Sequence, residues 1–169
     1  MIRVLALLLL PIAAQAQDVV NIRSGIACPP DEIGLSPAPG TIDGFIRNID
    51  EDVVFLSGSH VVPAADGVAF GLTYELTGDV ELVGTQVVIT HPPMGEDKIT
   101  KQVIFSSPSS ARTAVSIYEF DYDYEKVLGE WTFTAIYRGK TLYREVFTVV
   151  PPHMVPELAT ECNFQDLLG

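Results

Sequence analysis

The sequence predicts an all-β fold, an antiparallel β-sandwich of seven to eight strands. Three observations support this class. Apolar and polar residues alternate from about residue 43 to residue 150, turn-forming residues separate the alternating runs, and no segment shows the period of an amphipathic helix. A parallel sheet would need helical crossovers between its strands. The length of 169 residues suits a single domain.

Residues 1–16 have the features of an export signal. Arg3 supplies one positive charge, an apolar run follows it, and Ala14-Gln15-Ala16 provides the small residues of a cleavage site. Cleavage after Ala16 would place the mature protein in the periplasm or outside the cell. The apolar run is far shorter than the ~20 residues that cross a bilayer, so we expect no membrane insertion.

Two proline-rich segments flank the alternating region. We expect residues 17–42 to form an arm without long regular structure and residues 151–169 to form a tail, because both contain several prolines. Each segment contains one of the two cysteines, Cys28 and Cys162. In an oxidising compartment, a disulfide between them would tie the arm and the tail beside the domain of residues 43–150.

The alternation identifies candidate strands and their buried faces. Every second residue from Val68 to Leu76 is apolar, and the run from Trp131 to Arg138 alternates with Ile136 as an exception. We expect Trp131, the single tryptophan, to anchor the core, since burying so large a side chain is strongly favourable. Further strands are predicted within residues 52–62, 85–90, 99–105 and 113–124.

The last two strands, within residues 129–150, are predicted to form a hairpin with its turn near Gly139. Two registers are compatible with the sequence. A two-residue turn would set Phe133 opposite Val146, whereas a three-residue loop would set Trp131 opposite Phe147. Both cannot hold, because a slip of one residue turns every side chain of one strand to the other face.

Scattered residues carry a resemblance to a known family. They are Val62-Pro63, Gly67, Phe70-Gly71, Tyr74, His91-Pro92-Pro93, Phe120-Asp121, the G-x-W-x-F strand from Gly129 to Phe133, Gly139 and Phe147-Thr148-Val149. This set resembles a family of small secreted bacterial proteins of unknown function, and the last hairpin is similar to the final strands of bacterial immunoglobulin-like domains. The resemblance implies an immunoglobulin-like sandwich. It supplies no catalytic or ligand residue.

The charge of the chain restricts its partners. The formal net charge is −12 at pH 7, from 22 acidic and 10 basic residues. Binding to nucleic acid or to anionic lipid depends on clustered Lys and Arg side chains. We therefore expect no nucleic acid partner, whereas cationic partners are compatible with the charge.

The segment from Tyr118 to Glu125 is the best candidate for a metal site. On a continuous strand, Glu119, Asp121, Asp123 and Glu125 would share one face, and carboxylates are ligands for Ca²⁺. Neighbours on that face would lie nearly 7 Å apart at ~3.3 Å rise per residue, so they would not converge on one ion without a folded loop.

A copper site is a second metal hypothesis, and catalysis has weaker support. His91 lies near Met94 in the sequence, and exported sandwiches can bind copper through imidazole and thioether groups. Ser57-Gly58-Ser59-His60 brings serine near histidine but lacks the G-x-S-x-G pattern of a nucleophile elbow. No cofactor motif is present.

These observations lead to one functional expectation and one alternative. We expect a non-catalytic, exported binding module of the bacterial cell envelope, whose partner is an envelope or extracellular protein that contacts end loops or free strand edges. The alternative is a periplasmic protein that binds Ca²⁺, copper or a small ligand, with Asp121, Asp123, Glu125 and His91 as candidate metal ligands.

Overall fold

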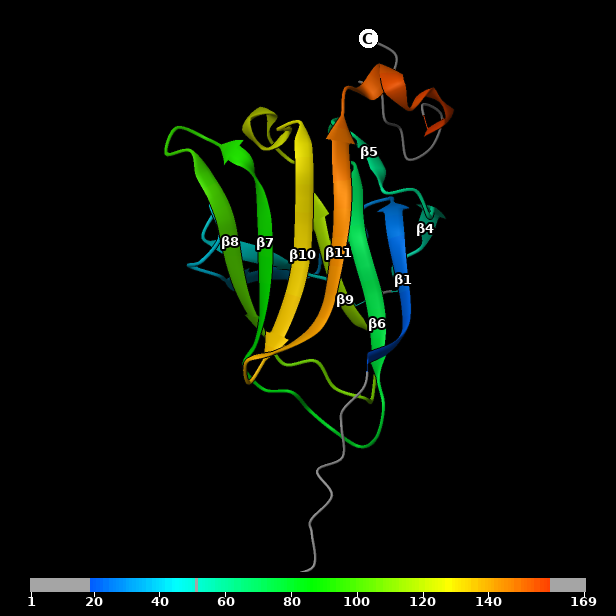
Figure 1. The fold of residues 1–169 in the computed structure, drawn as a ribbon, viewed down its shortest axis with the longest axis vertical. Helices are drawn as coiled ribbons and strands as arrows, with labels where there is room; N and C mark the ends of the chain where they lie inside the picture. Colours follow the sequence, from blue (N-terminus) through cyan, green and yellow to red (C-terminus); the bar gives the residue numbers. More distant parts are fainter. Residues whose placement is uncertain (1–18, 51, 159–169) are drawn as a thin grey trace, which may run out of the picture.

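The structure, a computed structural model, describes residues 19–50 and 52–158 as two sheets packed face to face (Figure 1). One sheet has the order β4 (Phe55–Ser57), β1 (Val19–Ala27), β6 (Ala69–Leu76) and β9 (Ala114–Glu119). The other has the order β5 (Val61–Pro63), β11 (Lys140–Val150), β10 (Gly129–Tyr137), β7 (Thr85–Met94) and β8 (Ile99–Ser106). All neighbours pair antiparallel except β5 and β11.

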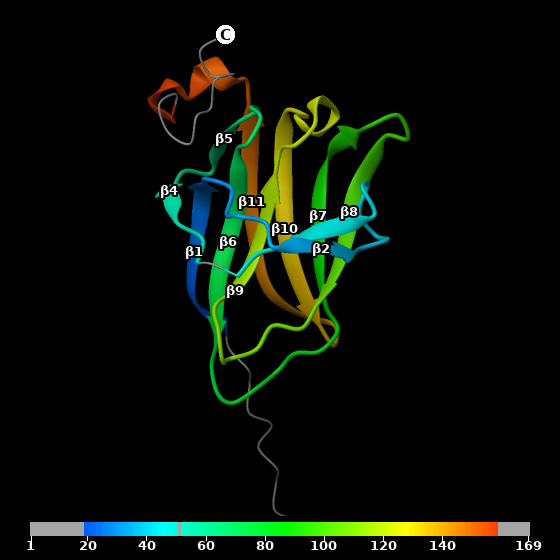
Figure 2. The same cartoon turned by 180° about the vertical axis from the view of Figure 1, so that it is seen from behind.

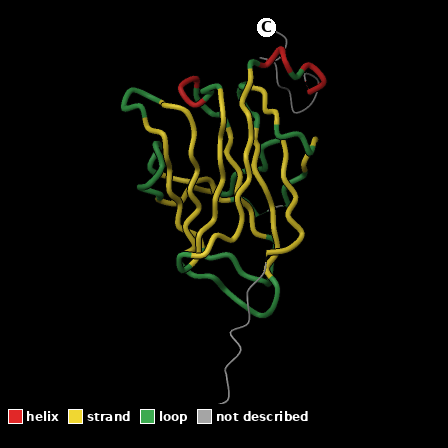
Figure 3. The backbone as a smooth tube through the Cα atoms, viewed as in Figure 1, coloured by secondary structure: helices red, strands yellow, loops and turns green. Residues whose placement is uncertain are grey.

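The predicted all-β sandwich is therefore confirmed, with nine strands in its two layers among the described residues. Loops gather at the two ends of the sandwich, and within residues 19–50 and 52–158 helical structure is limited to short 3₁₀ turns (Figure 3). These turns are η1 (Asp123–Glu125), η2 (Pro152–Met154) and η3 (Pro156–Leu158). No helix in the described ranges is long and apolar enough to cross a membrane.

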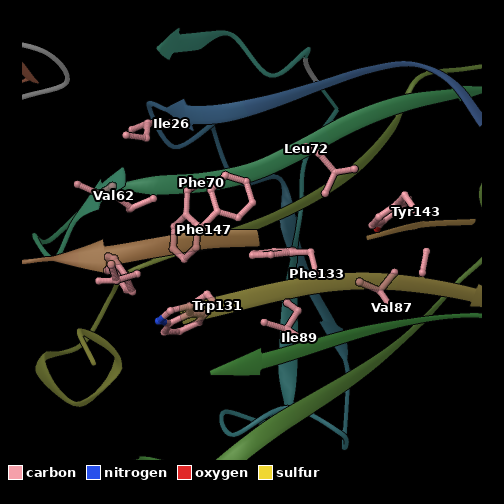
Figure 4. Packing of buried hydrophobic residues seen from close by; sticks show 14 of the residues in the cluster. Ile26, Val62, Phe70, Leu72, Val87, Ile89, Trp131, Phe133, Tyr143 and Phe147 are labelled. Carbon is pink, nitrogen blue, oxygen red and sulfur yellow. The ribbon is translucent and has the colours of Figure 1, made fainter. Parts of the chain in front are cut away.

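The core between the layers is centred on aromatic rings (Figure 4). The ring of Phe70 on β6 lies 5.4 Å from those of Trp131 and Phe147 and 5.6 Å from that of Phe133, each time edge to face. Such pairs contribute ~0.5–1.5 kcal/mol beyond the burial of apolar area. Trp131 is fully buried, and its Nε1 donates a hydrogen bond to the Val127 carbonyl at 3.1 Å.

The last hairpin combines features of both predicted registers. Trp131 lies opposite Phe147, as the longer loop required, but the turn itself contains only Arg138 and Gly139. Both turn residues have positive φ, 48° and 78°, which is the pattern of a type I′ turn. An irregularity in the pairing between Ala135 and Ile136 restores the register, because β11 contributes one additional residue there.

The prediction of an N-terminal arm without long regular structure is wrong for the first part of that arm. Residues 17–42 were expected to lack long regular structure, yet Val19–Ala27 form β1, which lies between β4 and β6 inside the four-stranded sheet. The alternation that marks strands is interrupted in this segment. Asn21 adopts a positive φ of 52°, and the pairing with β6 shifts between Val20 and Arg23.

The arm also contains β2 (Gly34–Pro37), which forms a two-stranded ribbon with β3 (Phe45–Asn48) at the start of the predicted domain. Figure 2 shows this β2–β3 ribbon lying across one open side of the sandwich, from β9 to β8. Two hydrogen bonds tie its turn to β8: Val103 N–H donates to the Gly40 carbonyl at 2.9 Å, and Ile42 N–H donates to Gln102 Oε1 at 3.0 Å.

Two predictions concern residues outside the described ranges. The signal peptide of residues 1–16 lies there completely, and so does Cys162, the predicted partner of Cys28. Cys28 itself follows the last residue of β1 directly. The disulfide and the export signal therefore stay predictions.

Candidate functional site

A groove lies at the side of the sandwich where strands β7, β8 and β9 and the β2–β3 ribbon all contribute to its lining. Its volume is about 240 Å³. Its apolar lining comes from Val87 and Ile89 of β7, Ile104 of β8 and Ile117 of β9. The groove exists because β9 and β8 are the edge strands of different sheets, so the layers do not close on each other at this side.

The mouth of the groove is charged. Arg47 of β3 forms ion pairs with Asp121 at 2.7 Å, with Glu119 at 3.7 Å, and with Glu32. Asp43 also lines the groove and accepts a hydrogen bond from the Tyr124 hydroxyl. A single guanidinium therefore stands among several carboxylates, and the mouth keeps an excess of negative charge.

Glu119 shows the electrostatic effect of this arrangement. The pKa of Glu119 is raised to about 7, mainly by burial and also by the charge of Asp121, while Arg47 acts in the opposite direction. The side chain is 22% exposed, so it lies at the boundary between the groove and solvent. A cation placed near Glu119 would favour its charged form.

Glu125 points into the interior. It does not share one face with the other three carboxylates, as a continuous strand would require. Strand β9 ends at Glu119, and the chain then folds into the 3₁₀ turn η1, which points Glu125 inward. Its carboxylate accepts hydrogen bonds from the Tyr118 hydroxyl at 2.7 Å and from the backbone N–H groups of Asp121 and Tyr122 at 2.7 and 2.9 Å. Burial raises the pKa of Glu125, and these donors oppose the rise.

The other two carboxylates and the histidine have separate partners. Asp123 projects into solvent and pairs with Lys126 at 2.8 Å, whereas Asp121 pairs with Arg47. His91 is buried and packs against Trp131 with the rings tilted and their centroids 4.7 Å apart. Within the described ranges, no three His, Cys, Asp or Glu side chains are grouped so that they could hold a metal ion.

His91 is held as a neutral ring. Its Nδ1 bonds the Pro92 carbonyl at 2.8 Å, and because a carbonyl only accepts, this nitrogen carries the proton. Nε2 then accepts from the Gln102 amide at 3.2 Å. Burial lowers the pKa of His91, which is consistent with the neutral form. Both ring nitrogens are thus engaged, and this arrangement has a structural explanation without a metal.

The outward side of β8, β7, β10 and β11 forms a second surface, which we call the outer face. In Figure 1 these strands lie in front, and no other described element is drawn over them. Three cross-strand rows, read from β8 to β11, are Lys101, Thr90, Thr132 and Val146; Val103, Val88, Thr134 and Arg144; and Phe105, Gln86, Ile136 and Thr141. These twelve positions contain two basic side chains and no acidic one.

The outer face also departs from the usual polar composition of a solvated sheet surface. The Phe105 side chain is 66% exposed, and Val88, Val103, Ile136 and Val146 are only half-buried. A signal for this surface existed in the sequence, because Ile136 interrupts the alternation of its strand. The groove had no such signal, because its lining comes from several segments, far apart in the sequence, that only the fold brings together.

Comparisons with known proteins agree with this fold. The profile of a family described as "Domain of unknown function (DUF3859)" matches residues 41–149. The chain is also similar to an immunoglobulin-like protein from Pseudomonas aeruginosa, with 22% sequence identity and a TM-score of 0.56, over 82% of this chain and 99% of that one. No curated protein matches. At this identity, the likeness establishes the immunoglobulin-like fold alone.

Proposed function

This chain belongs to the domain family of unknown function that matches residues 41–149, and we propose that it is an exported, non-catalytic interaction module of the bacterial cell envelope. The outer face of the five-stranded sheet binds a partner protein. The observation that carries this proposal is the composition of the three rows, where uncharged side chains form the centre and no acidic one occurs; Glu130 lies in the next row, opposite Thr148.

Interfaces between proteins are depleted of charge at their centre and polar at their rim. The outer face has this arrangement. Val88, Thr134 and Ile136 lie toward its middle, and the basic groups of Lys101 and Arg144 lie at opposite edges. Phe105 supplies an exposed aromatic ring of the kind that often anchors a partner.

The charges of the face favour an acidic partner over a second copy of the chain. Two copies packed outer face to outer face would bring the like charges of Lys101 and Arg144 toward one another. A partner surface with carboxylates around an uncharged centre would complement the face. The export signal of residues 1–16 and the predicted disulfide support a location in the periplasm or outside the cell.

Site-specific crosslinking in living cells tests this function. A photoreactive phenylalanine analogue at Phe105 should capture a protein partner, whereas the same analogue at Val83 should not. Val83 lies outside the outer face, in the loop between β6 and β7, and is 65% exposed, which matches the 66% of Phe105. Equal capture at both positions, or capture only of a second copy of the chain, would contradict the proposal.

Charge reversal provides the specificity control. The pair Lys101→Glu and Arg144→Glu should abolish capture at Phe105, because it places acidic groups against an acidic partner. The pair Lys98→Glu and Arg112→Glu changes the net charge equally at exposed loop positions and should leave capture intact. Identical losses from both pairs would show that net charge alone acts, and the outer face would then not be the binding surface.

A further inference from the structure

We propose that the groove lined by β7, β8, β9 and the β2–β3 ribbon is a binding site for a small organic cation, an alkyl or arylalkyl amine whose apolar part lies inside and whose ammonium group meets the acidic mouth. This inference is independent of the outer face. The groove opens on the inner side of β7 and β8, and the outer face is the opposite side of the same strands.

The size of the groove limits the apolar part of the ligand. Drug-sized ligands occupy pockets of ~300–1,000 Å³, and this groove holds about 240 Å³. A chain of about six carbons or one aromatic ring is the scale of ligand that such a volume admits. The aliphatic side chains of Val87, Ile89, Ile104 and Ile117 provide the apolar contact.

The sign of the charge at the mouth selects a cation. Arg47 contributes one positive charge, its partners Glu32 and Asp121 contribute two negative ones, and Glu119 contributes a third when it is ionised. Asp43 adds another carboxylate at the groove. An entering ammonium group would relieve the repulsion among these carboxylates, whereas an entering carboxylate would increase it.

The groups that would meet the cation are accessible and close to the apolar lining. The side chains of Glu119 and Asp121 are 22% and 24% exposed, so they combine contact with solvent and partial desolvation. Glu119 follows Ile117 by two residues at the end of β9, and both line the groove. A partly desolvated carboxylate pairs with a cation more strongly than one in open water.

Three probes of equal chain length test the proposal in solution with the full mature chain: hexylammonium, 1-hexanol and hexanoate. We expect hexylammonium to shift the backbone amide NMR signals of the groove strands β8 and β9 in a saturable way. Hexanol should bind about tenfold more weakly, a difference of about 1.4 kcal/mol, and hexanoate should not bind. Equal binding of all three probes, or shifts outside the groove only, would overturn the proposal.

A matched pair of variants locates the cation. Glu119→Gln should weaken hexylammonium binding severalfold and leave hexanol binding unchanged. Asp123→Asn removes the same charge from a side chain that is 98% exposed and pairs with Lys126, so it should leave both affinities unchanged. If both variants weakened hexylammonium equally, general charge attraction would explain the binding. If the variants do not fold, the comparison of the three probes on the unaltered chain still decides the matter.

Discussion

Gly25 of β1 lies directly opposite Gly71 of β6, and the absence of a side chain at each position lets a neighbouring strand approach closely. A Cβ on Gly25 would lie 2.0 Å from the Ser57 carbonyl oxygen of β4, and one on Gly71 would lie 2.2 Å from that of Ser116 in β9. The two glycines have φ values of 153° and 149°, which other residues rarely adopt. The four-stranded sheet depends on this pair for its spacing.

The first prediction follows from this pair. Gly71→Ala should reduce the free energy of unfolding by about 3 kcal/mol or more, because the new methyl group would overlap backbone atoms of β9 that cannot rotate away. Gly58→Ala is the control, since its Cβ would find nothing nearer than the Ser24 carbonyl at 4.0 Å. It should change stability by less than about 0.5 kcal/mol in urea unfolding. Equal effects of the two substitutions would contradict the close approach.

The second prediction concerns the pH dependence of stability. Because the pKa of Glu119 rises to about 7 in the folded chain from an ordinary value of 4.5, the folded state holds a proton that the unfolded chain releases. The contribution of Glu119 to stability is therefore lost as the pH rises from about 4.5 to about 7. Glu119→Gln should remove this loss. The change that it causes in the free energy of unfolding should be more favourable at pH 8 than at pH 4 by about 1–2 kcal/mol.

Thermal unfolding of both chains between pH 4 and pH 8 measures this difference. Asp123→Asn serves as the control, because Asp123 lies in solvent. Its curve should run parallel to that of the unaltered chain. If the Glu119→Gln curve also ran parallel, Glu119 would titrate as an ordinary surface carboxyl group.

The third prediction concerns a contact between β1 and β11. Ser24 Oγ lies 2.8 Å from His60 Nε2, and His60 Nδ1 bonds the Val146 carbonyl at 2.9 Å. His60→Ala should cost about 1–2 kcal/mol of stability and Ser24→Ala about 1 kcal/mol, as for typical hydrogen bonds. The double variant should cost less than the sum of the two, because both remove one shared contact.

The same contact tests the non-catalytic role. A serine and a histidine at this distance could serve as nucleophile and base. Glu145 lies 3.8 Å from His60 Nε2, which is the nitrogen that faces Ser24. Nδ1 bonds a backbone carbonyl, so no carboxylate accepts a hydrogen bond from Nδ1 as the third member of a catalytic triad does. We expect a fluorophosphonate probe to leave Ser24 unlabelled. Stoichiometric labelling, detected by mass spectrometry, would contradict this role.

The fourth prediction concerns metals. Ca²⁺, Cu²⁺ and a chelator should each leave the melting temperature unchanged, because Asp121, Asp123, Glu125 and His91 each have different partners and do not converge. A ligand that binds the folded state alone would raise the melting temperature. Stabilisation by Cu²⁺ that disappears in His91→Ala, or by Ca²⁺ that disappears in Asp121→Asn, would support a metal site after all.

The sequence was sufficient to predict the layered fold and the burial of Trp131. Both signals, the alternation with period two and the large aromatic residue, can be recognised from residues that are close together in the sequence. It was insufficient for β1, where the positive φ of Asn21 and the shifted pairing interrupt that alternation. The hairpin register stayed open between two alternatives for a similar reason, since the additional residue of β11 leaves no mark on the composition of that strand.

The acidic segment after β9 shows a different limit. A continuous strand would place Glu119, Asp121, Asp123 and Glu125 on one face, but the backbone N–H groups of Asp121 and Tyr122 need acceptors once the strand ends. Glu125 supplies them by folding inward. A tertiary requirement of this kind overrides the alternation, and so the candidate site could not be read from spacing alone.

The parallel pairing of β5 with β11 has a consequence for how the chain reaches its native state. A protein that crosses a membrane as an unfolded chain emerges with its N-terminus first. Strand β1 would therefore arrive before its partner β6, and β5 long before its partner β11. The four-stranded layer would be complete once β9 is through, but the five-stranded layer cannot be completed until the final hairpin has followed. If the chain is exported in this way, we expect the core between the layers to close only when translocation is nearly finished, because Trp131, Phe133 and Phe147 all come from that hairpin.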